Sequence, residues 1–160
     1  MAERELCYVL RDFARDVLKG TAWDEFGKCR APKVVDSFIP PRTGVNNSTN
    51  YPILVIRPIG GRTGQQGGLS VRVAMMVGVE SEDIDGFSYC LHVLQVLRTA
   101  LLALPYSWIQ YGGDCYLLDR ESIEWQLPED QPYPYWELEI FSTWTIGGVT
   151  RPDPFGQIRS

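Results

Sequence analysis

The stretch that decides the fold runs from Tyr51 to Leu104: YPILVIRPIGGRTGQQGGLSVRVAMMVGVESEDIDGFSYCLHVLQVLRTALLAL. Its pattern predicts a buried strand over Tyr51–Arg57 and a second strand over Leu69–Val79. The connection Gly60–Gly68 has nine residues, too many for a tight hairpin, and its five glycines favour a mobile, exposed arm. An acidic turn, Glu80–Asp85, then leads into an amphipathic helix. These strands and the helix are apolar enough to supply most of a core.

On the N-terminal side, apolar residues recur at helical spacing from Ala2 to Lys19, and Gly20 stands where a left-handed cap is expected. Val34–Ile39 is a short extended piece that two prolines end. On the C-terminal side, the pattern predicts strands over Cys115–Leu118 and Ile123–Leu127, the second of which could continue the first.

The last strand is expected over Tyr135–Ile146, where apolar and polar residues alternate. The alternation places Trp136, Leu138, Ile140 and Trp144 on one side and Glu137, Glu139, Ser142 and Thr145 on the other. The order of elements predicts an α+β fold: an antiparallel sheet of four or more strands with two α-helices packed on one face. We expect one domain over residues 1–146 and a flexible C-terminal tail over residues 147–160.

The pattern also predicts buried faces within the helices. The second helix should bury the apolar residues that recur along it, which are Ile84, Phe87, Leu91, Leu94, Val96, Leu97, Leu101 and Leu104. Pro105 should end that helix. Cys7 and Cys90 lie on the expected helix faces and should behave as small buried hydrophobic residues.

Composition narrows the function classes. The chain has 160 residues and a formal net charge of −5, which argues against a nucleic-acid binder, although a local basic patch remains compatible with it. Four cysteines without a C-x-x-C pair, together with a single histidine, do not predict a metal site, and no cofactor is expected. The charged first twenty residues predict no signal peptide, and no apolar run is long enough to cross a bilayer.

The sequence contains no catalytic constellation, so we do not expect an enzyme. The glycine-rich connection fits neither G-x-G-x-x-G nor a Walker motif, and it lies between two strands rather than before a helix. His92 is a lone histidine on a helix and has no partner nucleophile. A metal-dependent hydrolase remains an alternative of low weight, based on four acids close in sequence: Asp114, Asp119, Glu121 and Glu124.

Aromatic residues are concentrated in the C-terminal half of the chain, from Tyr106 to Trp144. A sheet of this size could bury several of them in its core. Others could serve an interface, where aromatic side chains supply much of the binding energy. The sequence does not decide between these two uses.

Three segments together resemble a known family: YPILVIRPIGG, VRVAMMVGVESEDIDGFSYCLHVLQVLRTALL and LPEDQPYPYWELEIFSTWTI. In their order and in their residue patterns they resemble the tail terminators, the tail-completion proteins in the neck region of long-tailed bacteriophages. The resemblance covers the chain from Tyr51 to Ile146. It implies a structural virion protein without catalytic residues.

The resemblance also implies partners and a location. The subunit would assemble in the host cytoplasm as a homo-hexameric ring at the head-proximal end of the tail. There it would bind the tail tube protein, stop tube polymerisation and join head–tail connector proteins, with no membrane involved. Genomic DNA would pass through the ring without specific binding. Alternatives are another neck or connector protein, or an accessory phage-encoded binding protein that acts as a monomer.

Two contact surfaces are expected on such a subunit. The glycine-rich connection would contact the tube or neighbouring subunits through Arg62, Gln65 and Gln66. The acidic turn would form a second surface through Glu82, Asp83 and Asp85. We expect Trp136 to serve packing rather than contact.

Overall fold

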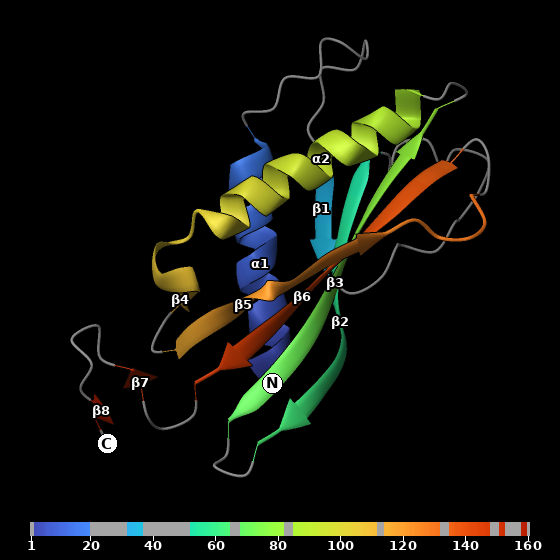
Figure 1. The fold of residues 1–160 in the computed structure, drawn as a ribbon. Coiled ribbons are helices and arrows are strands. Elements are labelled where there is room, and N and C mark those ends of the chain that lie inside the picture. The colour runs from blue at the N-terminus through green and yellow to red at the C-terminus, as the bar shows by residue number, and fades with distance from the viewer. Residues whose placement is uncertain are drawn as a thin grey trace.

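The strands on either side of the glycine-rich connection form the centre of the fold (Figure 1). The structure is a computed structural model, and it describes residues 2–19, 32–36, 52–64, 68–81, 85–111, 114–131 and 135–147, with the backbone of 151–152 and 158–159. Its elements are α1 (Ala2–Leu18), β1 (Lys33–Asp36), β2 (Ile53–Thr63), β3 (Leu69–Glu80), α2 (Asp85–Leu102), the 3-10 turn η3 (Pro105–Ser107), β4 (Trp108–Tyr111), β5 (Asp114–Gln126), β6 (Tyr135–Ile146), β7 (Arg151–Pro152) and β8 (Ile158–Arg159).

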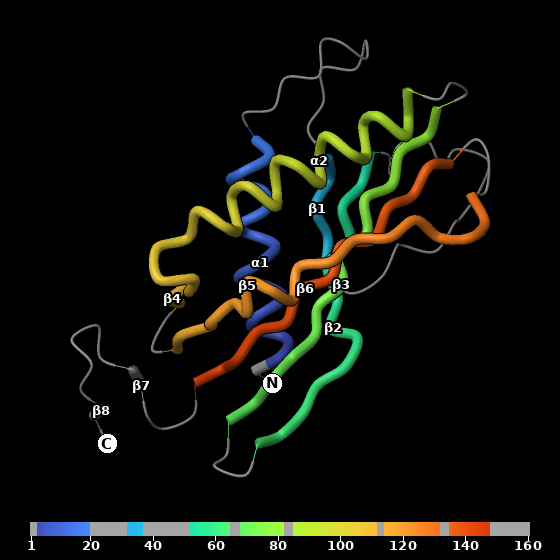
Figure 2. Tube along the Cα trace, viewed as in Figure 1, coloured from blue at the N-terminus to red at the C-terminus, as the bar shows by residue number. Residues whose placement is uncertain are grey.

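The main sheet has six strands in the order β1-β2-β3-β6-β5-β4. Four of its five strand pairs are antiparallel, but β1 runs parallel to β2. The fold is α+β as expected, whereas the prediction of a purely antiparallel sheet is wrong. A strand of four residues carries no signal of its direction in its own sequence. Figure 2 shows β3 and β6 running side by side through the middle of the sheet.

The glycine-rich connection is shorter than the sequence suggested. Its first residues belong to β2, which pairs with β3 as far as Thr63 opposite Leu69, with a bulge between Pro58 and Gly60. A Cβ at position 61 would lie 2.9 Å from the carbonyl oxygen of Ser70, so close approach of two backbones explains this glycine. The prediction that all of Gly60–Gly68 forms the connection is therefore wrong, because residues 60–63 pair with β3 as part of a strand.

One hydrophobic cluster contains buried residues of both helices and of alternate positions in five strands. In β3 the cluster takes every second residue, from Val71 to Val79. The positions between them face the other way. Each fully buried Leu or Ile side chain contributes about 1.5–3 kcal/mol of transfer free energy, so this cluster holds the fold together. The largest fully buried members are Trp144, Tyr116, Leu6, Leu10, Leu18, Leu54, Ile56, Met75, Leu97, Leu101 and Leu138.

The helices agree with the expected boundaries but not with every expected face. The first helix is confirmed as α1, and the second as α2, which ends before Pro105; the two contact each other where they cross in Figure 1. Because α2 is apolar on most sides, periodicity alone did not select its buried face. Phe87, Leu91, Val96 and Leu104 are only partly buried and Ile84 lies outside the described residues. The fully buried positions are Gly86, Tyr89, Cys90, Val93, Leu94, Leu97 and Leu101.

The C-terminal strands decide between two open alternatives and correct one expectation. The two pieces expected around residue 120 form one strand, β5, with an irregularity between Asp119 and Glu124. The last strand has the expected bounds, but Ser142 lies on the cluster side, where its hydroxyl accepts a hydrogen bond from Nε1 of Trp144 at 2.9 Å. Beyond it, β7 and β8 pair antiparallel within the expected tail.

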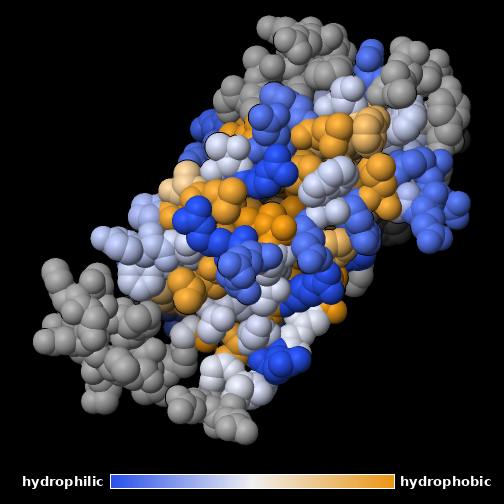
Figure 3. Space-filling model, in the orientation of Figure 1, coloured by the Kyte–Doolittle hydropathy of each residue, from blue (hydrophilic) through white to orange (hydrophobic). Residues whose placement is uncertain are grey.

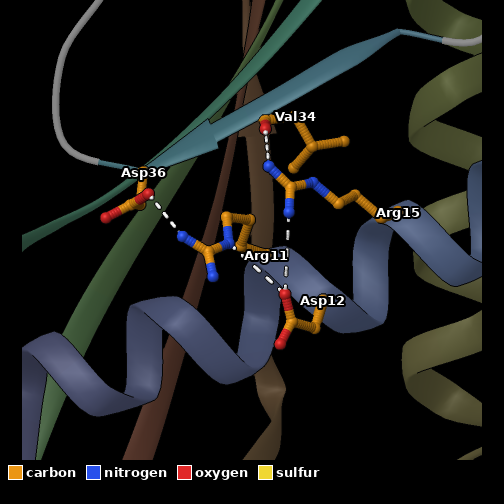
Figure 4. Close-up of polar contacts among 5 residues, drawn as sticks. All are labelled: Arg11, Asp12, Arg15, Val34 and Asp36. Atoms are coloured by element: carbon orange, nitrogen blue, oxygen red, sulfur yellow. Dashed lines mark hydrogen bonds and ion pairs between the residues drawn. The ribbon is translucent and has the colours of Figure 1, made fainter.

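Arginines of α1 join this helix to the outer strand of the sheet (Figure 4). Nη2 of Arg15 donates a hydrogen bond to the carbonyl oxygen of Val34 at 3.0 Å, and Nη1 of Arg11 lies 3.0 Å from Oδ1 of Asp36. Asp12 accepts a contact from each arginine. The half-buried Arg11–Asp36 pair contributes about 1 kcal/mol. These contacts hold α1 against β1.

Candidate protein-contact surface

Two of the six expected contact residues are described. Arg62 lies in β2 rather than in a loop, and its side chain is exposed. Asp85 is the first residue of α2 and is also exposed. The expected contacts Gln65, Gln66, Glu82 and Asp83 lie outside the described residues.

The structure separates the two expected surfaces. Arg62 is opposite Ser70 near the start of β3, and Asp85 follows Glu80 at its other end. The strand between these ends has a length of about 30 Å, since each residue of a strand rises about 3.3 Å. One partner could contact both surfaces only by spanning the whole sheet.

The outer positions of the sheet carry the most ordered charge pattern in the described residues. We use "outer positions" for those that alternate with the residues of the large hydrophobic cluster, and "outer face" for the surface that they form. Cross-strand neighbours share a face, so the register assigns each position. On β1, β2 and β3 the charged outer positions are Lys33, Arg57, Arg62 and Arg72, with one acid, Glu80, at the end of β3.

The other half of the outer face is acidic. On β5 and β6 the outer positions include Asp119, Glu124, Glu137 and Glu139, and no cation stands at a described, registered outer position of these two strands. The outer face therefore carries positive charge on one side and negative charge on the other.

One arginine joins the two halves. The guanidinium of Arg72 lies over the ring of Phe141, 4.7 Å from its centroid, and Nη2 of Arg72 is 3.9 Å from Oε2 of Glu124. This contact shields Phe141, which is only 9% exposed on the outer face. The Arg72 and Glu124 side chains remain 50% and 70% exposed, so the pair itself adds little stability.

The long strands β2 and β5 extend beyond the short strands that pair with them at the two edges of the sheet, β1 and β4. β1 pairs with β2 only as far as Ile56, and β4 pairs with β5 only as far as Leu117. Within the described residues, no strand lies on the side of Arg57–Thr63 that faces away from β3, or on the side of Leu118–Gln126 that faces away from β6. All of Pro58–Thr63 is exposed, as is most of the β5 segment.

The β5 segment has an ordered bulge. The hydroxyl of Ser122 donates to the carbonyl oxygen of Asp119 and accepts a hydrogen bond from the backbone N–H of Thr143 at 2.8 Å. Oδ1 of Asp119 accepts a hydrogen bond from the backbone N–H of Glu121 at 3.2 Å. These contacts fix the bulge and leave the Glu121 side chain exposed.

Aromatic residues of the C-terminal half are divided between the core and the surface. Trp144 and Tyr116 are fully buried, whereas Tyr106, Tyr111 and Trp125 are 76%, 56% and 45% exposed. Tyr106 has a positive φ of 55°, a region that bulky residues rarely adopt. Figure 3 shows apolar residues interspersed with hydrophilic ones on the face in view.

The acids of the hydrolase alternative do not form a metal site. Asp114 pairs with Tyr111 at the start of β5, far along the strand from Glu124, which contacts Arg72. In the described part of the chain, no group of three or more His, Cys, Asp or Glu side chains could hold a metal ion. His92 is exposed on α2. None of the described helices is long and apolar enough to cross a membrane.

Sequence reasoning missed the charge division of the outer face. Every one of its charges is visible in the sequence, and each strand alternates. The missing information was the strand order and register, which place Arg62 and Glu124 on the same face although more than sixty residues separate them. Alternation within β5 also fails at its bulge, so no simple period relates Asp119 to Glu124.

No protein-family model matches the chain, and no curated protein matches it.

Proposed function

We propose that the chain is a structural virion protein, a tail terminator that forms a hexameric ring on the head-proximal end of a phage tail. In this role it stops polymerisation of the tail tube and provides the surface for joining the head. The proposal takes both helices to cover one face of the sheet, as the cluster shared by α1, α2 and the strands supports.

The observation that carries the proposal is the exposed end of the β2–β3 hairpin. Residues Pro58–Gly64 are all exposed, yet most of them pair with β3 on either side of the bulge. The backbone N–H of Gly64 also donates a hydrogen bond to the carbonyl oxygen of Gly68 at 2.7 Å, which keeps the ends of β2 and β3 close together. An exposed hairpin whose strands are already paired loses less conformational entropy on binding a partner than an unpaired loop would, so it suits a docking element.

The sequence resemblance and the charge support the same role. The strands and helix of Tyr51–Leu102, which carry most of the resemblance, form the centre of the observed sheet and its helix. A net charge of −5 suits a ring through which DNA must pass without being gripped. The expected partners are further copies of the chain, the tail tube protein and head–tail connector proteins.

The test is electron microscopy of particles assembled without the chain. We expect tails of abnormal length that fail to join heads, and normal particles when the wild-type chain is supplied in trans. Tails of normal length that join heads normally would show that the chain is not a tail terminator.

A further inference from the structure

In the part of the chain that the structure describes, each side of the sheet has a segment of long strand with no strand on its outer side, and the two segments differ in charge. We call Arg57–Thr63 of β2 the basic edge; it contains two arginines and no acid. We call Leu118–Gln126 of β5 the acidic edge; it contains Asp119, Glu121 and Glu124 with one cation, Arg120. Each edge also exposes a large apolar side chain, Ile59 at 42% and Trp125 at 45%.

These opposite charges cannot neutralise each other within one molecule. β3 and β6 lie between β2 and β5, so the two edges are three interstrand spacings apart. That separation is about 14 Å. It exceeds the Debye length of about 8 Å at physiological ionic strength, so the two edges are screened from each other. The exposed charges of Arg62 on the basic edge and Glu121 on the acidic edge can therefore interact with another molecule.

We propose that the basic edge of one copy docks against the acidic edge of the next copy, so that subunits join head to tail. The partner is a second copy because the same chain carries both complementary surfaces. A head-to-tail contact leaves one basic and one acidic edge open at the ends of any chain of subunits, and rotation about the contact closes a ring. The contact rests on the proposed function, since it names the interface of the proposed ring.

The contact is made by side chains rather than by strand addition. Pro58 has no N–H to donate to a neighbouring strand, and a bulge follows it. The acidic edge is interrupted by its own bulge between Asp119 and Glu124. Such features block regular edge-to-edge pairing. They leave Arg62 on one edge and Glu121 on the other as exposed charges that can pair across copies.

Charge reversal on each edge tests the contact. Arg62→Glu and Glu121→Arg each place like charges across it, and each should weaken self-association at least tenfold. An equimolar mixture of the two variants restores opposite charges at every contact and should recover assembly. Arg98→Glu on α2 and Asp16→Arg on α1 are controls that change net charge equally at exposed helix positions. They should associate like the wild type.

Sedimentation velocity over a range of concentrations, at low and high salt, gives the readout. The wild type should form species larger than a dimer, and high salt should weaken them. Circular dichroism confirms that each variant is folded. The contact is overturned if the wild type stays monomeric or stops at a dimer. It is also overturned if the edge variants associate like the wild type, if their mixture stays dissociated, or if the controls lose association equally. Tail length in particles without the chain judges the proposed function separately, so the two can fail independently.

Discussion

Two buried thiols should make the folded state less stable as the pH becomes alkaline. Burial raises the pKa of Cys90 from 9.0 to about 12, with a smaller contribution from the charge of Glu137, and burial raises the pKa of Cys7 to about 11, with Asp36 contributing. The prediction that both cysteines are small buried hydrophobic residues is confirmed. Cys90 also donates from Sγ to the carbonyl oxygen of Trp136 at 3.6 Å.

Because the folded pKa of Cys90 is raised, its contribution to stability is complete below pH 9, the unfolded value, and is lost as the pH rises toward about 12. In the unfolded chain the thiol ionises first, which favours unfolding. We expect the free energy of unfolding of the wild type to fall more steeply over this range than that of Cys90→Ala. Urea unfolding at several pH values measures both slopes, and parallel slopes would contradict the assignment.

Tyr116 has a fully buried ring, and its hydroxyl has no hydrogen-bond partner within the described residues. An unsatisfied buried hydroxyl costs about 1–3 kcal/mol. We therefore expect Tyr116→Phe to keep or slightly raise the free energy of unfolding, measured by urea denaturation. Tyr116→Ala, which removes the ring, should lower it by about 3–5 kcal/mol. A loss in Tyr116→Phe as large as that in Tyr116→Ala would mean that the hydroxyl is satisfied.

At the scale of elements, Trp136 fixes the start of α2 against β6. Its indole Nε1 donates a hydrogen bond to the carbonyl oxygen of Ser81, within the acidic turn, at 2.9 Å. Gly86 lies so close to the ring that an added Cβ would clash with Cδ1 of Trp136 and lie 2.9 Å from Cβ of Ser81. The packing role expected for Trp136 agrees with these contacts.

Gly86→Ala should therefore destabilise the fold, although alanine is the better helix former. Overpacking costs about 1–3 kcal/mol, which exceeds the helix-propensity gain of about 0.5–1 kcal/mol. Ser88→Ala is the matched control at an exposed position of the same helix, and it should leave stability almost unchanged. Thermal unfolding compares the two variants. A Gly86→Ala protein that melts at or above the wild-type temperature would rule out the close packing.

The long elements could be predicted from the sequence, and the short ones could not. α1, α2 and β6 extend over at least three turns or ten residues, so their periods are well sampled. β1 and β4 have four residues each, too few to show a period or a direction. Glycines hid the end of β2, because Gly61 is there to let two strands approach rather than to form a loop.

Only part of the candidate surface could be predicted from the sequence, because the rest depends on the order of the strands. Exposure of Arg62 and Asp85 follows from their polar neighbourhoods, and both are exposed in the structure. The division of the outer face into basic and acidic halves depends on which strands are neighbours. That order depends on long-range pairing, such as β3 beside β6, which no local pattern encodes.

At the scale of the whole molecule, the sheet combines an exposed hairpin end with an outer face whose two halves carry opposite charge. The proposed head-to-tail contact would join copies of the chain in one direction and leave the hairpin end to contact another protein. A tail terminator needs both properties, because it must close a ring and also bind the tube.

The most direct test locates the chain in the assembled particle. Electron microscopy of particles that carry a labelled copy should show the label at the head-proximal end of the tail, at the junction with the head. Label elsewhere on the particle, or particles that contain none of the chain, would contradict the account.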